Sequence, residues 1–144
     1  MSTESDARLE HLLDQMTVEE LVRLTAGDDI WHTAAVERLG IPRMRVSDGP
    51  VGVRGTRFDG EASINAPCST SLAATWDMDA VEQIGRMLSR ELQAKGAHVL
   101  LAPTVNLHRT PVGGRNFECM SEDPYLTARI AVAYVRGVQH DGLA

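Results

Sequence analysis

The spacing of apolar residues predicts helices in the first and last parts of the chain. An i, i+3, i+4, i+7 face is formed by Leu9, Leu12, Leu13 and Met16. Thr17, with Glu20 three positions later, has the form of a capping box, so a second short helix is expected to begin there and to end at Gly27. Later apolar stripes predict helices over residues 77–95 and from Pro124 to about residue 139. We expect the apolar faces of all these helices to be buried by packing.

Two short apolar segments have the length of strands. Residues 43–46 are one candidate, and residues 98–102 form a compact run between Gly96 and Pro103, as expected of a strand buried on both faces. Each is followed by a polar loop and then a helix. This alternation predicts an α/β fold, namely the first two or so βα units of an incomplete (β/α) TIM-barrel-like domain preceded by short helices. A complete barrel needs about 250 residues, so residues 1–144 are expected to be its N-terminal part.

Composition narrows the classes of partner. The chain has 144 residues, a net charge of −6, 43% hydrophobic residues and 24% charged residues, which is ordinary for a globular protein. The acidic balance argues against a nucleic-acid partner, and the lack of a long apolar run argues against a membrane span. A polar, acidic start without a signal peptide predicts a cytoplasmic protein. Cys68 and Cys119 are expected to be free thiols.

The two polar loops carry the candidate binding residues. Asp48 and Arg54 follow the first strand candidate, whereas Arg115, Asn116 and Glu118 follow the second. Carboxylate oxygens accept hydrogen bonds from hydroxyl groups and guanidinium groups donate to them, so a sugar is the obvious ligand. A phosphate or carboxylate substrate could use the arginines alone. In the simpler interpretation, Asp48 only caps the turn that it starts and Arg54 is a solvated charge.

Other reactive residues lack a supporting pattern. His32, His98 and His108 show neither an i, i+4 pair nor an HExxH motif, so neither a metal nor another cofactor is expected. No serine has the G-x-S-x-G setting of a nucleophile. Trp31 and Trp76 are interpreted as core or rim packing residues and not as platforms for sugar rings.

Several segments together resemble the family 3 glycoside hydrolases, most closely the β-glucosidases of bacterial and fungal type. The resemblance extends from about residue 9 to the end of the chain. It rests on GDDIWHT (27–33), SDGPVGVRG (47–55), CSTSLAATWD (68–77), AKGAHVLLAPTVNLHRTPVGGRNFECMSEDPYLT (94–127) and GVQHDG (137–142).

The resemblance implies roles for residues in both loops. Asp48 corresponds to an aspartate that accepts hydrogen bonds from hydroxyl groups of the sugar in the −1 subsite, and Arg115 corresponds to an arginine that binds the same sugar. Arg54 aligns with an arginine that supports this site. Glu118 and the SEDP residues (121–124) are interpreted as structural. The ligand implied is a small β-glucoside or oligosaccharide.

The same resemblance implies that the catalytic groups lie elsewhere. From the residues alone, Asp48 and Glu118 could be nominated as the two carboxylates of a glycosidase. In the family, however, the nucleophile lies in a later Ser-Asp-Trp-like motif, and the acid/base comes from a later domain. A Lys-His pair is also expected downstream, but Lys95 is the only lysine here. The chain is thus expected to be a fragment without catalytic residues that is completed by the rest of the barrel and by later domains.

Two alternatives stay open at this point. The first is a truncated, non-catalytic module that binds sugar or another subunit. The second is a family member with β-xylosidase or β-N-acetylglucosaminidase specificity.

Overall fold

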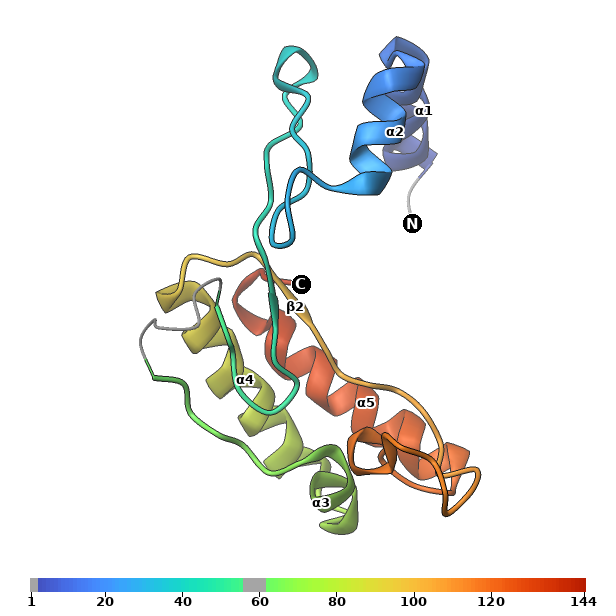
Figure 1. Ribbon diagram of the computed structural model, residues 1–144, viewed down its shortest axis with the longest axis vertical. Coiled ribbons are helices and arrows are strands. Elements are labelled where there is room, and N and C mark those ends of the chain that lie inside the picture. Colours follow the sequence, from blue (N-terminus) through green and yellow to red (C-terminus); the bar gives the residue numbers. More distant parts are fainter. Residues whose placement is uncertain (1–2, 56–61) are drawn as a thin grey trace. The chain divides into compact units, whose positions relative to one another are not determined.

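The computed structural model describes residues 3–55 and 62–144 of the chain. They belong to two compact units, Met1–Arg45 and Val46–Ala144, each with its own internal contacts (Figure 1). None of the described helices is long and apolar enough to cross a membrane. Among the described residues, both cysteines are free, as predicted.

The first unit contains the two predicted N-terminal helices, α1 (Thr3–Gln15) and α2 (Val18–Ala26). The capping box is confirmed, because the Thr17 hydroxyl accepts from the Glu20 amide at 3.2 Å while the Glu20 carboxylate accepts from the Thr17 amide at 2.9 Å. The expected burial is wrong for this pair of helices. Their exposed apolar side chains include Leu9, Leu13, Val18 and Val22. The helix α2 therefore forms with its local cap although the described residues leave these side chains exposed.

The rest of the first unit is a loop that contains one helical turn. The turn, η1 (Glu37–Leu39), ends at Gly40 in the left-handed conformation, which glycine adopts readily. The strand predicted at residues 43–46 is displaced. Instead, the Met44 carbonyl oxygen accepts a hydrogen bond from the Thr33 amide, and Arg45 forms an isolated antiparallel bridge with His32 within this unit.

The second unit is built on two short parallel strands, β1 (Val46–Asp48) and β2 (Val99–Leu101), in the register Val46↔Val99. The parallel α/β arrangement predicted from the sequence is therefore present. Burial of β2 on both faces is wrong, because Leu100 is buried whereas Leu101 is exposed. A buried face needs a second layer of side chains, and the described residues supply no such cover for Leu101.

The helices of this unit are α3 (Ser69–Ala74), α4 (Met78–Ala94) and α5 (Pro124–Val138). The starts of α4 and α5 are as predicted: Asp77 caps α4 through the Ala80 amide, and Asp123 caps α5 through the Tyr125 amide. The helix α3 was not predicted, because six residues are too few to show an apolar period. The buried core lies mainly between α4 and α5 and includes Val81, Leu88, Leu92, Leu126, Ile130 and Tyr134.

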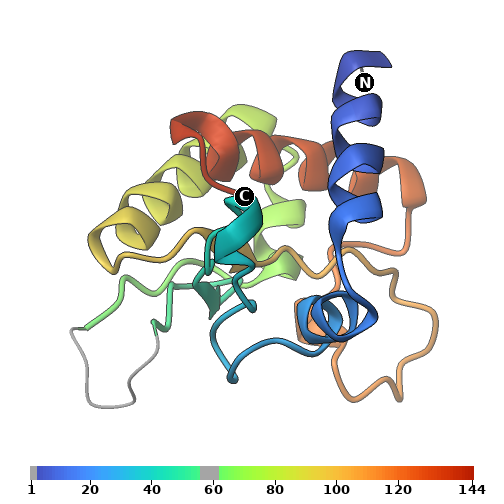
Figure 2. The ribbon, with the colours of Figure 1, turned by 90° about the horizontal axis from the view of Figure 1, so that it is seen from above.

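The helices α4 and α5 lie side by side, and their backbones meet at two glycines (Figures 1 and 2). A Cβ atom added at Gly85 would lie 2.5 Å from the Tyr134 carbonyl oxygen, and one added at Gly137 would lie 2.2 Å from the Glu82 carbonyl oxygen. Glycine inside a helix costs about 0.5–1 kcal/mol relative to alanine. Here that cost permits a backbone contact that any side chain would prevent.

We predict that Gly137→Ala destabilises the chain, although alanine is the better helix former. The added methyl group would push α4 and α5 apart, and overpacking of this kind costs about 1–3 kcal/mol. Urea unfolding followed by circular dichroism measures the change. Gly114→Ala is the matched control, because a Cβ there meets nothing within 4 Å. Equal stability of Gly137→Ala and the wild type would contradict the proposed tight contact.

Candidate functional site

Asp48 is the last residue of β1, and a tight turn brings Arg54 back beside it. The Arg54 amide donates to the Asp48 carbonyl oxygen at 3.0 Å. A Cβ on Gly49 would lie 1.9 Å from the Gly52 carbonyl oxygen, so the turn needs a glycine there. The Arg54 Nη1 and Asp48 Oδ2 atoms are 3.9 Å apart, and the two side chains are 41% and 51% exposed. The pair is loose and open to solvent, so Asp48 keeps oxygen lone pairs available to a ligand.

The loop after β1 is held from α4 by two side chains that the sequence analysis did not single out. The Glu91 carboxylate accepts from the Val53 amide at 3.3 Å and from the Ile64 amide at 2.6 Å. One turn later, Lys95 Nζ donates to the Val53 carbonyl oxygen at 2.7 Å. In sequence, Glu91 and Lys95 look like ordinary polar residues of a helix. No signal could reveal their role, because their partners are backbone groups tens of residues away.

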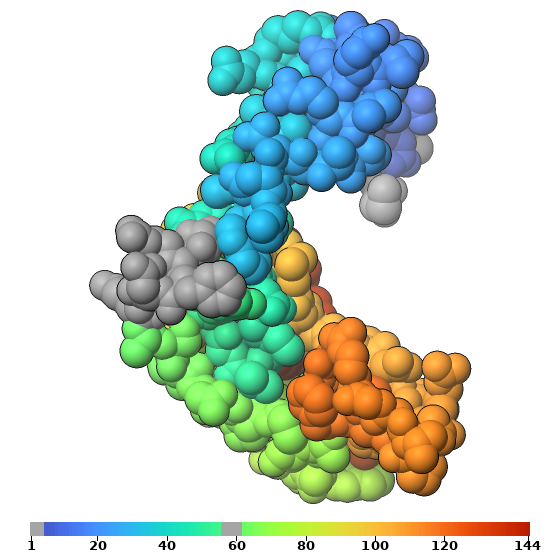
Figure 3. All heavy atoms as spheres, viewed as in Figure 1, coloured from blue at the N-terminus to red at the C-terminus, as the bar shows by residue number. Residues whose placement is uncertain are grey.

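Arg115 lies in the polar segment that follows β2, part of which appears in orange at the surface in Figure 3. Its Nε donates to Glu118 Oε1 at 3.1 Å, and its Nη2 donates to Glu118 Oε2. The Arg115 side chain is 76% exposed, whereas that of Glu118 is only 17% exposed. Thr104 also donates to Glu118, at 3.3 Å. The Glu118 carboxylate therefore fixes the orientation of the Arg115 guanidinium group, which stays accessible to solvent.

The bidentate contact between Arg115 and Glu118 shifts the pKa values of both groups. The hydrogen bond from Arg115 lowers the pKa of Glu118 below its ordinary value of 4.5, and the positive charge of Arg115 acts in the same direction. The hydrogen bond to Glu118 raises the pKa of Arg115 in turn. Glu118 is therefore an anion near neutral pH, with both oxygens engaged.

The structure pairs Asp48 with Arg54, and the loop that carries Arg115 leaves the same edge of the sheet. Asp48 and Leu101 are register partners at the carboxyl ends of β1 and β2, and the polar loops start from these ends. The hydrogen bond to Glu118 is the main cause that raises the pKa of Arg115, and the negative charge of Asp48 acts weakly in the same direction. Arg54 lies beside Asp48. Two carboxyl ends of adjacent parallel strands are where α/β proteins usually bind ligands.

Two further polar residues of the second loop form hydrogen bonds within it. The Asn116 amide group donates to the Thr110 carbonyl oxygen at 2.8 Å, and His108 Nε2 lies 2.7 Å from the Asn116 carbonyl oxygen. A shallow cavity of about 290 Å³ adjoins Arg115 and is lined also by Asn106 and Arg109. Asn116 and His108 therefore shape the loop, whereas Arg109 and Arg115 are exposed donors beside the cavity.

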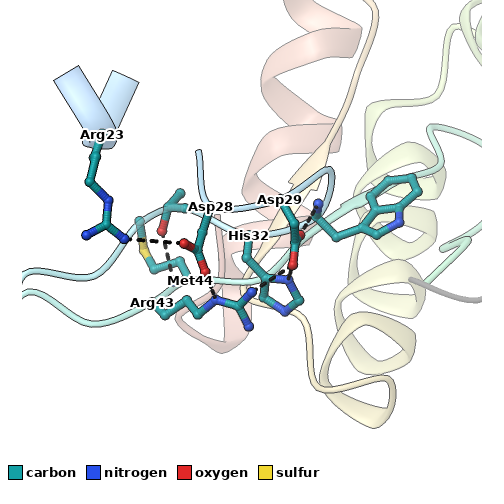
Figure 4. A network of polar contacts seen from close by, with 8 residues as sticks. Arg23, Asp28, Asp29, His32, Arg43 and Met44 are labelled. Carbon is teal, nitrogen blue, oxygen red and sulfur yellow. Dashed lines mark hydrogen bonds and ion pairs between the residues drawn. The ribbon is translucent and has the colours of Figure 1, made fainter. Parts of the chain in front are cut away.

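The GDDIWHT segment forms a separate polar network inside the first unit (Figure 4). Arg43 donates to Asp28 at 2.9 Å and to Asp29 at 2.7 Å. His32 Nδ1 lies 2.9 Å from each Asp29 carboxylate oxygen, and the Trp31 amide donates to Asp29 at 2.7 Å. These contacts account for the histidine as part of the loop's own framework. Within residues 3–55 and 62–144, no group of three or more His, Cys, Asp or Glu side chains is arranged to hold a metal ion.

We predict that Arg115→Ala returns the pKa of Glu118 towards 4.5. A carboxyl group whose pKa is lowered on folding stabilises the protein at pH values above its pKa in the unfolded state. This contribution is lost as the pH falls through the pKa of the folded state. The pH dependence of stability should therefore weaken near and below pH 4.5 in the variant. Carbon-13 NMR titration of the Glu118 carboxyl group measures the shift directly. Arg109→Ala is the control and should leave the titration of Glu118 unchanged. An unchanged titration in Arg115→Ala would contradict the ion pair between Arg115 and Glu118.

We also predict that Glu91→Gln loosens the loop that carries Arg54. An amide has one acceptor oxygen, so it cannot accept from Val53 and Ile64 as the carboxylate does. Loss of one such charge-assisted bond should cost about 1.5–3 kcal/mol. Hydrogen exchange of the Val53 and Ile64 amides should become faster. The control is Glu82→Gln, which removes an ion pair with Arg86 on the same helix and should not alter exchange at either amide. The same exchange rates in Glu91→Gln and the wild type would show that the Glu91 carboxylate does not hold this loop.

Comparison with known proteins gives this arrangement a context. The chain is 50% identical over 137 residues to a probable β-glucosidase I of Aspergillus clavatus, covering 94% of this chain and 16% of that protein. It is 51% identical over 138 residues to a β-glucosidase of Rhizobium radiobacter, covering 94% of this chain and 17% of that protein. The chain thus spans about one sixth of the length of these relatives.

Solved structures agree with the sequence comparison. The β-glucosidase of Kluyveromyces marxianus in complex with glucose matches with a TM-score of 0.87 and 48% identity, over 94% of this chain and 16% of that one. β-Glucosidase 3B of Thermotoga neapolitana in complex with α-D-glucose matches with a TM-score of 0.81 and 35% identity, over 94% of this chain and 22% of that one. Residues 10–144 match the family described as the glycosyl hydrolase family 3 N terminal domain. The chain therefore belongs to glycosyl hydrolase family 3, a family of glycosidases, and represents part of its N-terminal domain.

Proposed function

We propose that this chain forms one wall of the −1 sugar subsite of a retaining β-glucosidase. The observation that carries the proposal is the open Asp48–Arg54 pair at the carboxyl end of β1, next to β2, whose following loop presents the exposed Arg115. The open carboxylate of Asp48 can accept hydrogen bonds from sugar hydroxyl groups. Arg115, held from behind by Glu118, can donate to them.

The proposed setting is the start of a (β/α) barrel. The order β1, α4, β2, α5 supplies two strand–helix units. After α5, the Ala144 amide donates to the His98 carbonyl oxygen at 3.1 Å, and the Leu100 amide donates to an Ala144 oxygen at 2.7 Å. Bonds from one residue to both neighbours of Val99 are the pattern of a parallel strand. This supports a third strand beside β2, as continued barrel order requires.

The environment of each carboxylate supports a division of roles. Retaining hydrolysis needs a nucleophile and an acid/base about 5–5.5 Å apart. Glu118 is a poor candidate for either, because Arg115 occupies its oxygens and lowers its pKa. Asp48 is better suited to hold the sugar than to attack it, since it already lies beside the cationic side chain of Arg54. The nucleophile and the acid/base are accordingly assigned to sequence outside these 144 residues, and the double displacement uses neither a metal nor an organic cofactor.

Glucose is the preferred sugar in this proposal. The relatives named above are β-glucosidases, and the two solved structures contain glucose. Xylose lacks the C6 hydroxymethyl group, and N-acetylglucosamine carries a bulky group at C2. The binding of each of these two sugars to the chain is therefore compared with that of glucose.

We predict that the 144-residue chain binds glucose weakly and releases no p-nitrophenol from p-nitrophenyl β-glucoside. Glucose titration followed by amide NMR should shift the signals of Asp48, Arg54 and Arg115. Asp48→Asn removes a charged acceptor and should weaken binding about tenfold or more. Asp79→Asn, on the exposed face of α4, is the matched control and should bind like the wild type.

Three results would contradict the proposal. Turnover by the isolated chain would place catalytic groups within it. Unchanged affinity of Asp48→Asn would remove Asp48 from the subsite. Stronger binding of xylose or N-acetylglucosamine than of glucose would favour the corresponding β-xylosidase or β-N-acetylglucosaminidase.

A further inference from the structure

Trp76 has a backbone conformation that is unusual for a bulky residue. It follows α3 and its C-cap Thr75, with φ at 55°, in the left-handed region. The Trp76 amide donates to the Ala73 carbonyl oxygen at 3.1 Å, so this residue closes the end of the helix. Glycine or asparagine usually occupies such a position, because a large side chain there is sterically unfavourable. The tryptophan therefore carries a conformational cost.

Packing does not offset this cost. The Trp76 side chain was predicted to lie in the core or at its rim, but the residue is 68% exposed. A tryptophan that served to fill the interior would lose most of its accessible surface. Strained backbone that is not explained by burial is a feature of functional sites.

The exposed Trp76 borders a hollow of about 360 Å³ that shares no described lining residue with the cavity beside Arg115. Residues of α3, of the end of the loop after β2 and of the first turn of α5 line this hollow. Apolar surface is contributed by Met120 and Leu126, and polar groups by His108, Ser121 and Glu122. The volume is within the range of small-molecule pockets.

The polar groups of the hollow are held in place by their own contacts. His108 Nε2 lies 2.7 Å from the Asn116 carbonyl oxygen, so this nitrogen carries the hydrogen and Nδ1 of the neutral ring is an acceptor. The Thr70 hydroxyl donates to the Cys119 carbonyl oxygen at 2.7 Å. The Ser121 hydroxyl accepts from the Asp123 amide at 3.0 Å and keeps its own hydrogen to donate. The Glu122 carboxylate is exposed at this edge.

We propose that this hollow is a second carbohydrate-binding site, in which the Trp76 indole stacks on a pyranose ring of an oligosaccharide. A pyranose has an apolar face of C–H groups and a rim of hydroxyl groups. An aromatic face beside apolar side chains matches the first, and the acceptors of His108 and Glu122 match the second. The site itself follows from Trp76 and its surroundings, whereas the choice of a β-glucan chain as ligand rests on the proposed function.

The test compares Trp76→Gly with the wild type of the 144-residue chain, with cellotetraose as the probe. Glycine suits the left-handed position, so the variant should unfold at a higher urea concentration than the wild type. Loss of stacking should weaken cellotetraose binding about tenfold or more in calorimetry. A variant that is more stable and binds less well is the signature of a residue that is present for a ligand.

Two control variants sharpen the test. Trp76→Tyr keeps an aromatic face and should recover most of the affinity that Trp76→Gly loses. Trp31→Phe removes the other tryptophan and should bind cellotetraose like the wild type, with fluorescence quenching on binding that then reports on Trp76 alone. Binding by Trp76→Gly that equals that of the wild type would overturn the proposal. So would a loss of stability in Trp76→Gly, because it would assign a structural role to the indole.

The two sites can be separated with Asp48→Asn. If both proposals hold, this variant loses glucose binding and keeps the response of Trp76 to cellotetraose. If only the second site exists, Trp76→Gly alone changes binding. If Asp48→Asn abolishes binding of both ligands while Trp76→Gly changes neither, the second site is refuted and the first is retained.

Discussion

The contact between α4 and α5 at Gly85 and Gly137 is the constraint on which the second unit depends. Because neither residue has a side chain, the helix backbones approach closely and share one core. Both helices then reach the loop after β1: Glu91 on α4 accepts from the loop backbone, and the buried Tyr134 of α5 donates to the Pro50 carbonyl oxygen at 2.9 Å. Burial also raises the pKa of that tyrosine, which keeps its hydroxyl neutral as a donor. Helix packing thus fixes the loop that carries Arg54.

Charge serves two purposes in this unit, and burial distinguishes them. Glu118 is largely shielded from solvent and accepts hydrogen bonds from Arg115 and Thr104, so its carboxylate orients the Arg115 side chain. Asp48 is half exposed and only loosely paired with Arg54, so its oxygens remain open to a ligand. A sugar subsite needs both kinds of group, because a donor that binds hydroxyl groups selectively must be held in place before the ligand arrives.

Most of the local structure could be predicted from the sequence, because the interactions that decide it lie within four residues. The helices expected to begin near Thr17, Asp77 and Pro124 do so, and their caps are Thr17 with Glu20, Asp77 and Asp123. The apolar stripes of α4 and α5 identified the core, since a helix presents residues at that spacing on one face. The family resemblance selected Asp48, Arg54 and Arg115, because these residues stand within the motifs SDGPVGVRG and GGRNFE.

The sequence by itself determined the caps, the buried stripes, the alternation of strands and helices, and the family. Only the tertiary structure decided where β1 begins, that Leu101 is exposed, that Glu91 clamps a loop and that Trp76 faces solvent beside a hollow. The reason is the distance along the chain between interacting groups. A strand begins where its partner 53 positions later pairs with it, as Val46 does with Val99. Likewise, a polar side chain has a structural role only where folding brings a distant backbone group within its reach.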